Sequence, residues 1–216
     1  MNKSLSYVIT VLSTVSMILT LSCGKLDVVG KDSARAFGEL LQKAPGLVSE
    51  DTLGGGWSIT APDSGARFVW GAFGKMMIDI APFAAAGLDT LKLADAGAFS
   101  GGTLVIGTAL TLDAPPKTTP LASYEWIVKN NRDAIGYHAA LNHYGISLGN
   151  GNMFEWAKDL NTNDKDIVFV LNPEPFINAG VDVTKIEGWA FAKVTVDDEN
   201  GKPVQVDKIL KPFDLK

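Results

Sequence analysis

One twelve-residue phrase occurs twice in this chain, and it constrains the fold more than any other feature. Residues 82–93 read PFAAAGLDTLKL and residues 175–186 read PFINAGVDVTKI, 93 positions later, with six of the twelve positions identical. Proline suits the first turn of a short helix, glycine suits its end, and aspartate can cap the turn that follows. We therefore expect the same connection at both places, strand to short helix to strand, with Phe83 and Phe176 in the core.

The segments around both copies of the phrase have the patterns of β-strands. They are residues 75–80 and 103–112 around the first copy, and residues 167–171 and 189–196 around the second. These patterns predict an α+β fold, with a mixed or mainly antiparallel sheet and short helices. They also predict an internal duplication with pseudo-symmetric halves at 32–112 and 121–216.

Two further segments complete this prediction. The spacing of Phe37 and Leu40 predicts an amphipathic helix that begins at residue 32 or 33 and ends at Pro45. Beyond the linker at 113–120, the alternation of Tyr124, Trp126 and Val128 predicts a strand. Segment 113–160 has no counterpart in this comparison, which makes it the place to look for a site.

The N-terminus has the features of an export signal. A lysine at position 3 precedes an apolar run over residues 8–21, which is too short for a membrane span of about 20 residues. The run ends in Thr20-Leu21-Ser22-Cys23-Gly24. This sequence resembles the lipobox of bacterial lipoproteins, in the looser form found in spirochaetes. The resemblance implies that residues 1–22 are removed and that Cys23 carries acyl chains such as palmitate.

This resemblance sets the expected organisation and location. A tether over residues 23–31 leads to one globular domain over residues 32–216. The protein would be held in the cell envelope by lipid, and Gly24 after the cysteine favours the outer over the inner membrane. Cys23 is the only cysteine, so the chain cannot form an internal disulfide.

Charge narrows the classes of partner. Without residues 1–22 the chain has 18 Lys and Arg against 24 Asp and Glu, a net formal charge of −6. An acidic body disfavours nucleic acid and anionic headgroups as ligands of the folded surface. The expected partners are the membrane, reached through the lipid, and a small ligand or an envelope protein.

Candidate site residues gather within segment 137–156. They are the two histidines of the chain and three aromatic residues, namely Tyr137, His138, His143, Tyr144 and Trp156. Aromatic and imidazole side chains combine an apolar body with a polar tip, as ligand pockets require. We therefore expect this segment to form one wall of any pocket.

Metals and cofactors are not expected. On a helix, the two histidines would lie 140° apart and could not share an ion. Asp159, Asn161 and Asn163 have the first three spacings of a calcium loop, but the glycine and the final glutamate are missing. No nucleotide-binding or nucleophile motif occurs.

Three functional interpretations stay open. The favoured one is non-enzymatic binding of a small ligand or a protein partner by an anchored lipoprotein. The second is an exported hydrolase-like enzyme that uses His138 or His143 with a carboxylate such as Asp133, Glu155 or Asp159. The third is a structural assembly subunit.

Overall fold

The chain contains the same series of elements twice. The structure is a computed structural model that describes residues 23–52, 55–71, 73–93, 99–100, 102–110, 118–138, 142–160, 166–198 and 200–215. The elements up to residue 110, with η for a 3₁₀-helix, are α2 (Cys23–Lys43), η1 (Pro45–Leu47), β1 (Val48–Asp51), β2 (Gly56–Thr60), β3 (Arg67–Trp70), β4 (Phe73–Asp79), α3 (Ala81–Ala85), η2 (Thr90–Lys92), β5 (Phe99–Ser100) and β6 (Thr103–Leu110). Those after residue 118 are α4 (Pro120–Asn130), η3 (Arg132–Ala134), β7 (Ile135–His138), β8 (His143–Ser147), β9 (Met153–Ala157), β10 (Ile167–Leu171), α5 (Glu174–Asn178), β11 (Ala190–Asp197) and β12 (Pro203–Phe213).

Each series forms one antiparallel sheet, and the two sheets have the same strand order. The first sheet runs β1-β2-β3-β4-β6-β5, and the second runs β7-β8-β9-β10-β12-β11. The register repeats too, because Val48 pairs with Ile59 in the first half and Ile135 pairs with Ile146, 87 residues later in each strand. The predicted α+β class, with antiparallel sheets and related halves, is confirmed.

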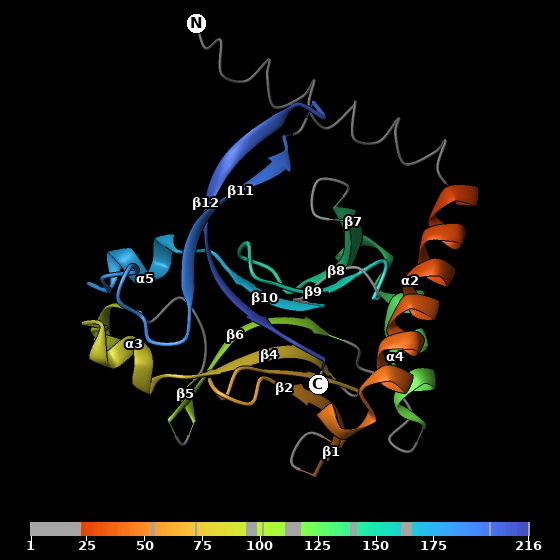
Figure 1. Cartoon of the computed structure of the whole chain (residues 1–216), viewed down its shortest axis with the longest axis horizontal. Coiled ribbons are helices and arrows are strands. Elements are labelled where there is room, and N and C mark those ends of the chain that lie inside the picture. Colours follow the sequence, from red (N-terminus) through yellow and green to blue (C-terminus); the bar gives the residue numbers. More distant parts are fainter. Residues whose placement is uncertain are drawn as a thin grey trace, which may run out of the picture.

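The two halves pack face to face around a pseudo-two-fold axis (Figure 1). Equivalent residues meet each other, as only residues near such an axis can. Phe68 stacks on its equivalent Phe154 with ring centroids 4.4 Å apart, and Phe37 stacks on its equivalent Tyr124 at 3.9 Å. Buried side chains of both halves form one hydrophobic core. Figure 1 shows α2 and α4 together on one side of the sheets, and α3 and α5 together on the other.

The repeated phrase lies on the same axis and forms the predicted short helices. Phe83 and Phe176 are buried, and their ring centroids are 4.9 Å apart. Gly87 and Gly180 end the two turns with φ of 102° and 91°. A Cβ on Gly87 would lie only 2.9 Å from the Gly180 carbonyl oxygen, so close approach as well as positive φ requires glycine here.

Backbone hydrogen bonds join the two copies in a reciprocal way. Asp89 N donates to Ala179 O, and Asp182 N donates to Ala86 O, both at 2.9 Å. Each aspartate also caps the turn that follows it, since Oδ1 of Asp89 accepts from Leu91 N and Oδ1 of Asp182 accepts from the amide two residues later. The phrase is repeated because both copies serve one joint between the halves.

Three expectations are corrected by the structure. Residues 23–31, expected to be a tether, belong to α2, because a helix whose later turns are packed extends readily at its end. The strand predicted through Tyr124 and Val128 is the helix α4, capped by the Thr119 side chain and begun by Pro120. Segment 113–160 does have a counterpart, since α4 to β9 match α2 to β3.

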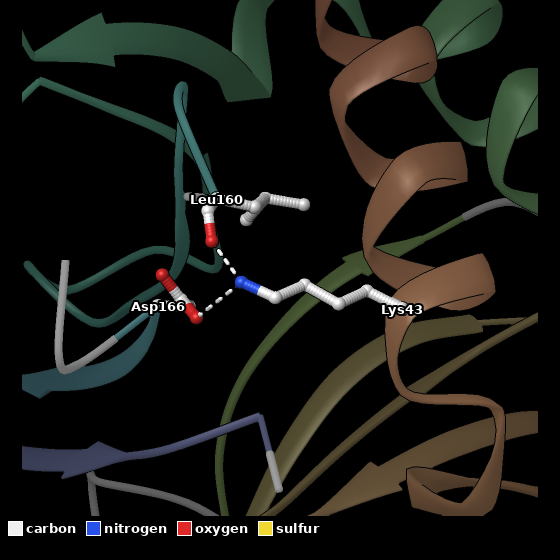
Figure 2. Close-up of polar contacts among 3 residues, drawn as sticks. All are labelled: Lys43, Leu160 and Asp166. Carbon is white, nitrogen blue, oxygen red and sulfur yellow. Dashed lines mark hydrogen bonds and ion pairs between the residues drawn. The ribbon is translucent and has the colours of Figure 1, made fainter. Parts of the chain in front are cut away.

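A lysine at the end of α2 ties this helix to the second half. Lys43 Nζ donates to Asp166 Oδ2 at 3.1 Å and to the Leu160 carbonyl (Figure 2). The Asp166 side chain is almost completely buried. A buried carboxylate needs such a partner, because leaving it unpaired costs free energy. The contact therefore holds the β9–β10 connection against α2.

Candidate functional site

The candidate site lies on the face of the second sheet that points away from the first. Phe154 and Trp156 of β9 point into the core between the sheets, with no exposed surface. Side chains alternate along a strand, so Glu155 between them points to the opposite face. Figure 1 shows that this face is concave, with β8, β9 and β10 at its base and β7 and the β11–β12 pair rising on either side.

A glycine on the neighbouring strand makes room for the Glu155 side chain on this face. Gly136, Gly145 and Glu155 lie side by side on β7, β8 and β9. A Cβ on Gly145 would lie 2.9 Å from Glu155 Cγ, a distance that real Cβ atoms do not adopt. The glycine therefore lets the carboxylate lie across its neighbouring strand.

The next row of the same face brings both histidines to this carboxylate. His138 and His143 are directly paired across the β7–β8 hairpin. His138 Nδ1 lies 2.7 Å from Glu155 Oε1, and His143 Nδ1 lies 3.8 Å from Glu155 Oε2. The two histidines are five residues apart in sequence. They meet because the chain forms a β-hairpin here and not a helix, on which they would lie 140° apart. We refer to Glu155, His138 and His143 as the Glu155 cluster.

The Glu155 cluster is buried but not fully hydrogen-bonded. Glu155 is 1% exposed and His143 is 7% exposed, while the His138 side chain is about one-third exposed. Among the described residues, neither Glu155 Oε2 nor His143 Nδ1 has a hydrogen-bond partner. Burial lowers the pKa of His143 below its usual value of 6.5, although the nearby Glu155 carboxylate partly opposes this. His143 is therefore neutral at pH 7, and the cluster keeps a carboxylate oxygen able to accept a hydrogen bond.

A lysine lies on the same concave face. Lys208 of β12 has the same orientation as Leu210, which pairs with Val170 of β10. Its Nζ donates to the Gly151 carbonyl at 3.3 Å. Burial lowers the Lys208 pKa, and the charge of Glu155 acts against this shift. An apolar side chain lies beside these polar groups, since Val168 of β10 pairs with Glu155.

The five predicted site residues do not form one group. His138 and His143 lie on the concave face, whereas Tyr144 and Trp156 are buried on the core face. Tyr137 lies on the core face too, and its ring centroid is 5.1 Å from that of Tyr144. Tyr144 and Trp156 therefore belong to the packed core, whereas Tyr137 is 38% exposed. The sequence indicates Glu155 only as one of three candidate carboxylates, and it does not indicate Lys208.

Cavities of pocket size lie elsewhere on the described part of the chain. One of about 780 Å³ lies between α2 and α4, lined by Gly38 and Leu121 among others, and not by segment 137–156. Another, of about 440 Å³, includes Asn150 and Asn152 of that segment in its wall. None of the five predicted site residues lines either cavity.

Metal ligation finds no support in the described residues, which contain no group of three or more His, Cys, Asp or Glu arranged to hold an ion. Of the calcium-like triplet, Asn161 and Asn163 lie outside the described residues. Within the same described ranges, no helix has the length and apolar character needed to cross a membrane.

Comparison of the chain with protein-family models, with curated proteins and with solved structures gave no match.

Proposed function

We propose that this chain is an envelope lipoprotein that binds a small ligand on the concave face of the second sheet. The single observation that carries the proposal is the buried Glu155 carboxylate with an oxygen that lacks a hydrogen-bond partner among the described residues. A buried acceptor in this state costs about 1–3 kcal/mol. A ligand that donates a hydrogen bond to Oε2 removes this cost, so binding and stability are linked.

The ligand class follows from the surroundings of the carboxylate. A donor that also carries positive charge gains most from a carboxylate next to a neutral His143. Val168 and Val170 line the same face of β10, where an apolar body can pack. We therefore expect a small amine with an apolar body.

The anchor belongs to the same proposal and rests on the sequence alone. Cys23 ends a signal-like apolar run and is the only cysteine of the chain. Acylation there would hold the protein in the envelope, with the outer membrane as the expected location. Cys23→Ala should release the protein from membranes, and a wild-type protein that incorporates no tagged fatty acid would contradict the anchor.

Thermal unfolding with three amines tests the ligand site. Benzylamine, phenethylamine and hexylamine each combine an ammonium group with an apolar body. At least one should raise the melting temperature of the wild type, by an amount that increases with its concentration. Glu155→Gln should abolish the increase, because its side chain has the same shape without the charge. If all three amines leave the wild type unchanged, the proposed ligand class is wrong.

An enzyme is a second candidate, favoured by one specific contact. The 2.7 Å contact of Glu155 with His138 Nδ1 fixes the imidazole as the carboxylate does in a base–orienter pair. Chemistry at His138 would then use Nε2 as a general base or acid. Turnover of a supplied substrate, lost in both His138→Gln and Glu155→Gln, would favour this candidate over simple binding.

A further inference from the structure

A pocket lined in part by polar side chains lies where the two halves meet. It has a volume of about 440 Å³ and joins η2 and β6 of the first half to the turn before β9 and to α5. Four asparagines line it: Asn150, Asn152, Asn172 and Asn178. Buried apolar side chains, including Phe176, lie among them. The pocket thus combines four carboxamides with an apolar base.

Two of these asparagines are held in place by backbone contacts. Asn152 is buried, and its Nδ2 donates to the Ile106 carbonyl of the first half. Its Oδ1 accepts from Asn172 N at 3.0 Å. In turn, Oδ1 of Asn172 accepts from Glu174 N at 3.2 Å. The amide groups are therefore preorganised, which lowers the entropic cost of binding.

The first half lacks these carboxamides at equivalent positions. Asn152 O accepts from Leu148 N just as Ala66 O accepts from Ala61 N, so Ala66 is the equivalent of Asn152. The phrase alignment makes Ala85 the equivalent of Asn178 and Asp79 the equivalent of Asn172. The same backbone is thus built without the asparagines in one half, so the fold itself does not require all of them.

The chemistry of the pocket selects one class of ligand. Each carboxamide offers both a donor and an acceptor, and a hydroxyl group does the same. Lys92 and Glu174 also line the pocket, and their opposite charges favour neither an anion nor a cation. A sugar ring has an apolar C–H face and a rim of hydroxyls. We propose that this pocket binds a neutral saccharide, independently of the Glu155 cluster.

Saturation-transfer NMR on the full chain tests the proposal with glucose, galactose, mannose and N-acetylglucosamine as probes. The main variant is Asn172→Asp with Asn178→Ala, which installs the residues of the first half. It should fold, because Asp79 Oδ1 accepts from Ala81 N at 3.0 Å just as Asn172 does from Glu174 N. The control is Asn130→Ala, on the exposed surface of α4.

At least one of the four sugars should give a signal with the wild type and with the control. The double variant should bind that sugar about tenfold or more weakly, as expected from the loss of two hydrogen bonds. Asn178→Ala alone gives the same test, with a smaller loss, if the double variant does not fold. The saccharide proposal is overturned if no sugar binds the wild type, and the pocket assignment is overturned if both variants bind as tightly as the wild type. Glu155→Gln should bind the sugar as tightly as the wild type does. The saccharide proposal can therefore hold even if the proposed amine site fails.

Discussion

The outer faces of the two sheets hold different polar groups on the same backbone. In the first half, Asp51 occupies the position of His138, and its buried carboxylate lies 3.7 Å from the Arg67 guanidinium. In the second half, the buried carboxylate of Glu155 faces two imidazoles. Arginine stays charged at any ordinary pH, whereas histidine changes charge near neutrality. The first half therefore has an ion pair whose cation is permanently charged. The second half has a carboxylate whose imidazole partners can change their charge.

This difference teaches where function can arise in a repeated fold. The axis between the halves is occupied by matched residues such as Phe68 and Phe154, which cannot change independently. The outer faces do not touch this axis, so each can change alone. Ser58 of the first half and Gly145 of the second, for instance, have equivalent places, and only the glycine admits the Glu155 side chain.

The largest effect should come from breaking the shared core. We expect Phe68→Ala and Phe154→Ala each to cost about 3–5 kcal/mol of unfolding free energy, because both rings are fully buried and stacked on each other. Chemical denaturation measures this cost. Leu91→Ala is the control, since Leu91 is 89% exposed and should change stability by less than about 0.5 kcal/mol. A large cost in only one of the two phenylalanine variants would contradict equal roles for the halves.

The next effect separates the two carboxylates. Arg67→Met should cost about 1–3 kcal/mol, because it leaves the buried Asp51 without its guanidinium. Glu155→Gln should change stability by less than about 1 kcal/mol, since it removes a buried charge as well as a contact. Denaturation with and without the amine ligands should show the opposite order for ligand binding. Glu155→Gln should lose the stabilisation by the amine, and Arg67→Met should keep it. Equal stability costs in both variants would remove the distinction between a structural and a functional carboxylate.

A pH dependence that arises from histidine should come from the second half alone, since both histidines of the chain are there. Burial lowers the His143 pKa in the folded state, so the unfolded chain binds the proton more readily. Stability should therefore decrease as the pH falls below about 6.5, the value of an unperturbed histidine. His143→Gln should flatten the curve of unfolding free energy between pH 7 and pH 5. An identical slope in the variant would show that His143 does not titrate in this way.

The smallest effect concerns how the equivalent helices begin. Thr119 caps α4 through a hydrogen bond from Ala122 N at 3.3 Å, whereas its equivalent, Asp32, lies inside the longer α2. Thr119→Ala should cost about 1 kcal/mol, and Asp32→Ala about 0.5 kcal/mol or less. Thermal unfolding of both variants checks this difference. Equal costs would mean that Asp32 has a role beyond its helical position.

The joint between the halves could be predicted from the sequence because every residue of the repeated phrase has a local role. Gly87 and Gly180 end a turn, and Asp89 and Asp182 cap the next one, so the local pattern was sufficient. The apolar residues of α4 fit the two-residue period of a strand as well as the period of a helix, so the sequence alone wrongly predicts a strand here. The Thr119-Pro120 pair is a local signal for a helix start, and packing against α2 then decides between helix and strand.

The candidate site could be predicted only in part. The histidines stood out by their rarity, but their meeting with Glu155 depends on the register of β8 and β9. The alternation along β9 separates Glu155 from Phe154 and Trp156, but it does not tell which face is the core. That choice is made by the other half of the molecule, through contacts more than 80 residues apart in sequence, such as Phe68 with Phe154.

The central claim is that Glu155 accepts a hydrogen bond from a bound ligand, while Asp51, the buried carboxylate on the outer face of the first half, is structural. Nitrogen NMR of the imidazoles tests this directly, because the chain contains only two histidines. Adding the amine that stabilises the wild type should shift the signals of both His138 and His143, and also in the matched control Asp51→Asn. In Glu155→Gln the same amine should shift neither. Equal shifts in Glu155→Gln and the wild type, or no shift in the wild type, would contradict the claim.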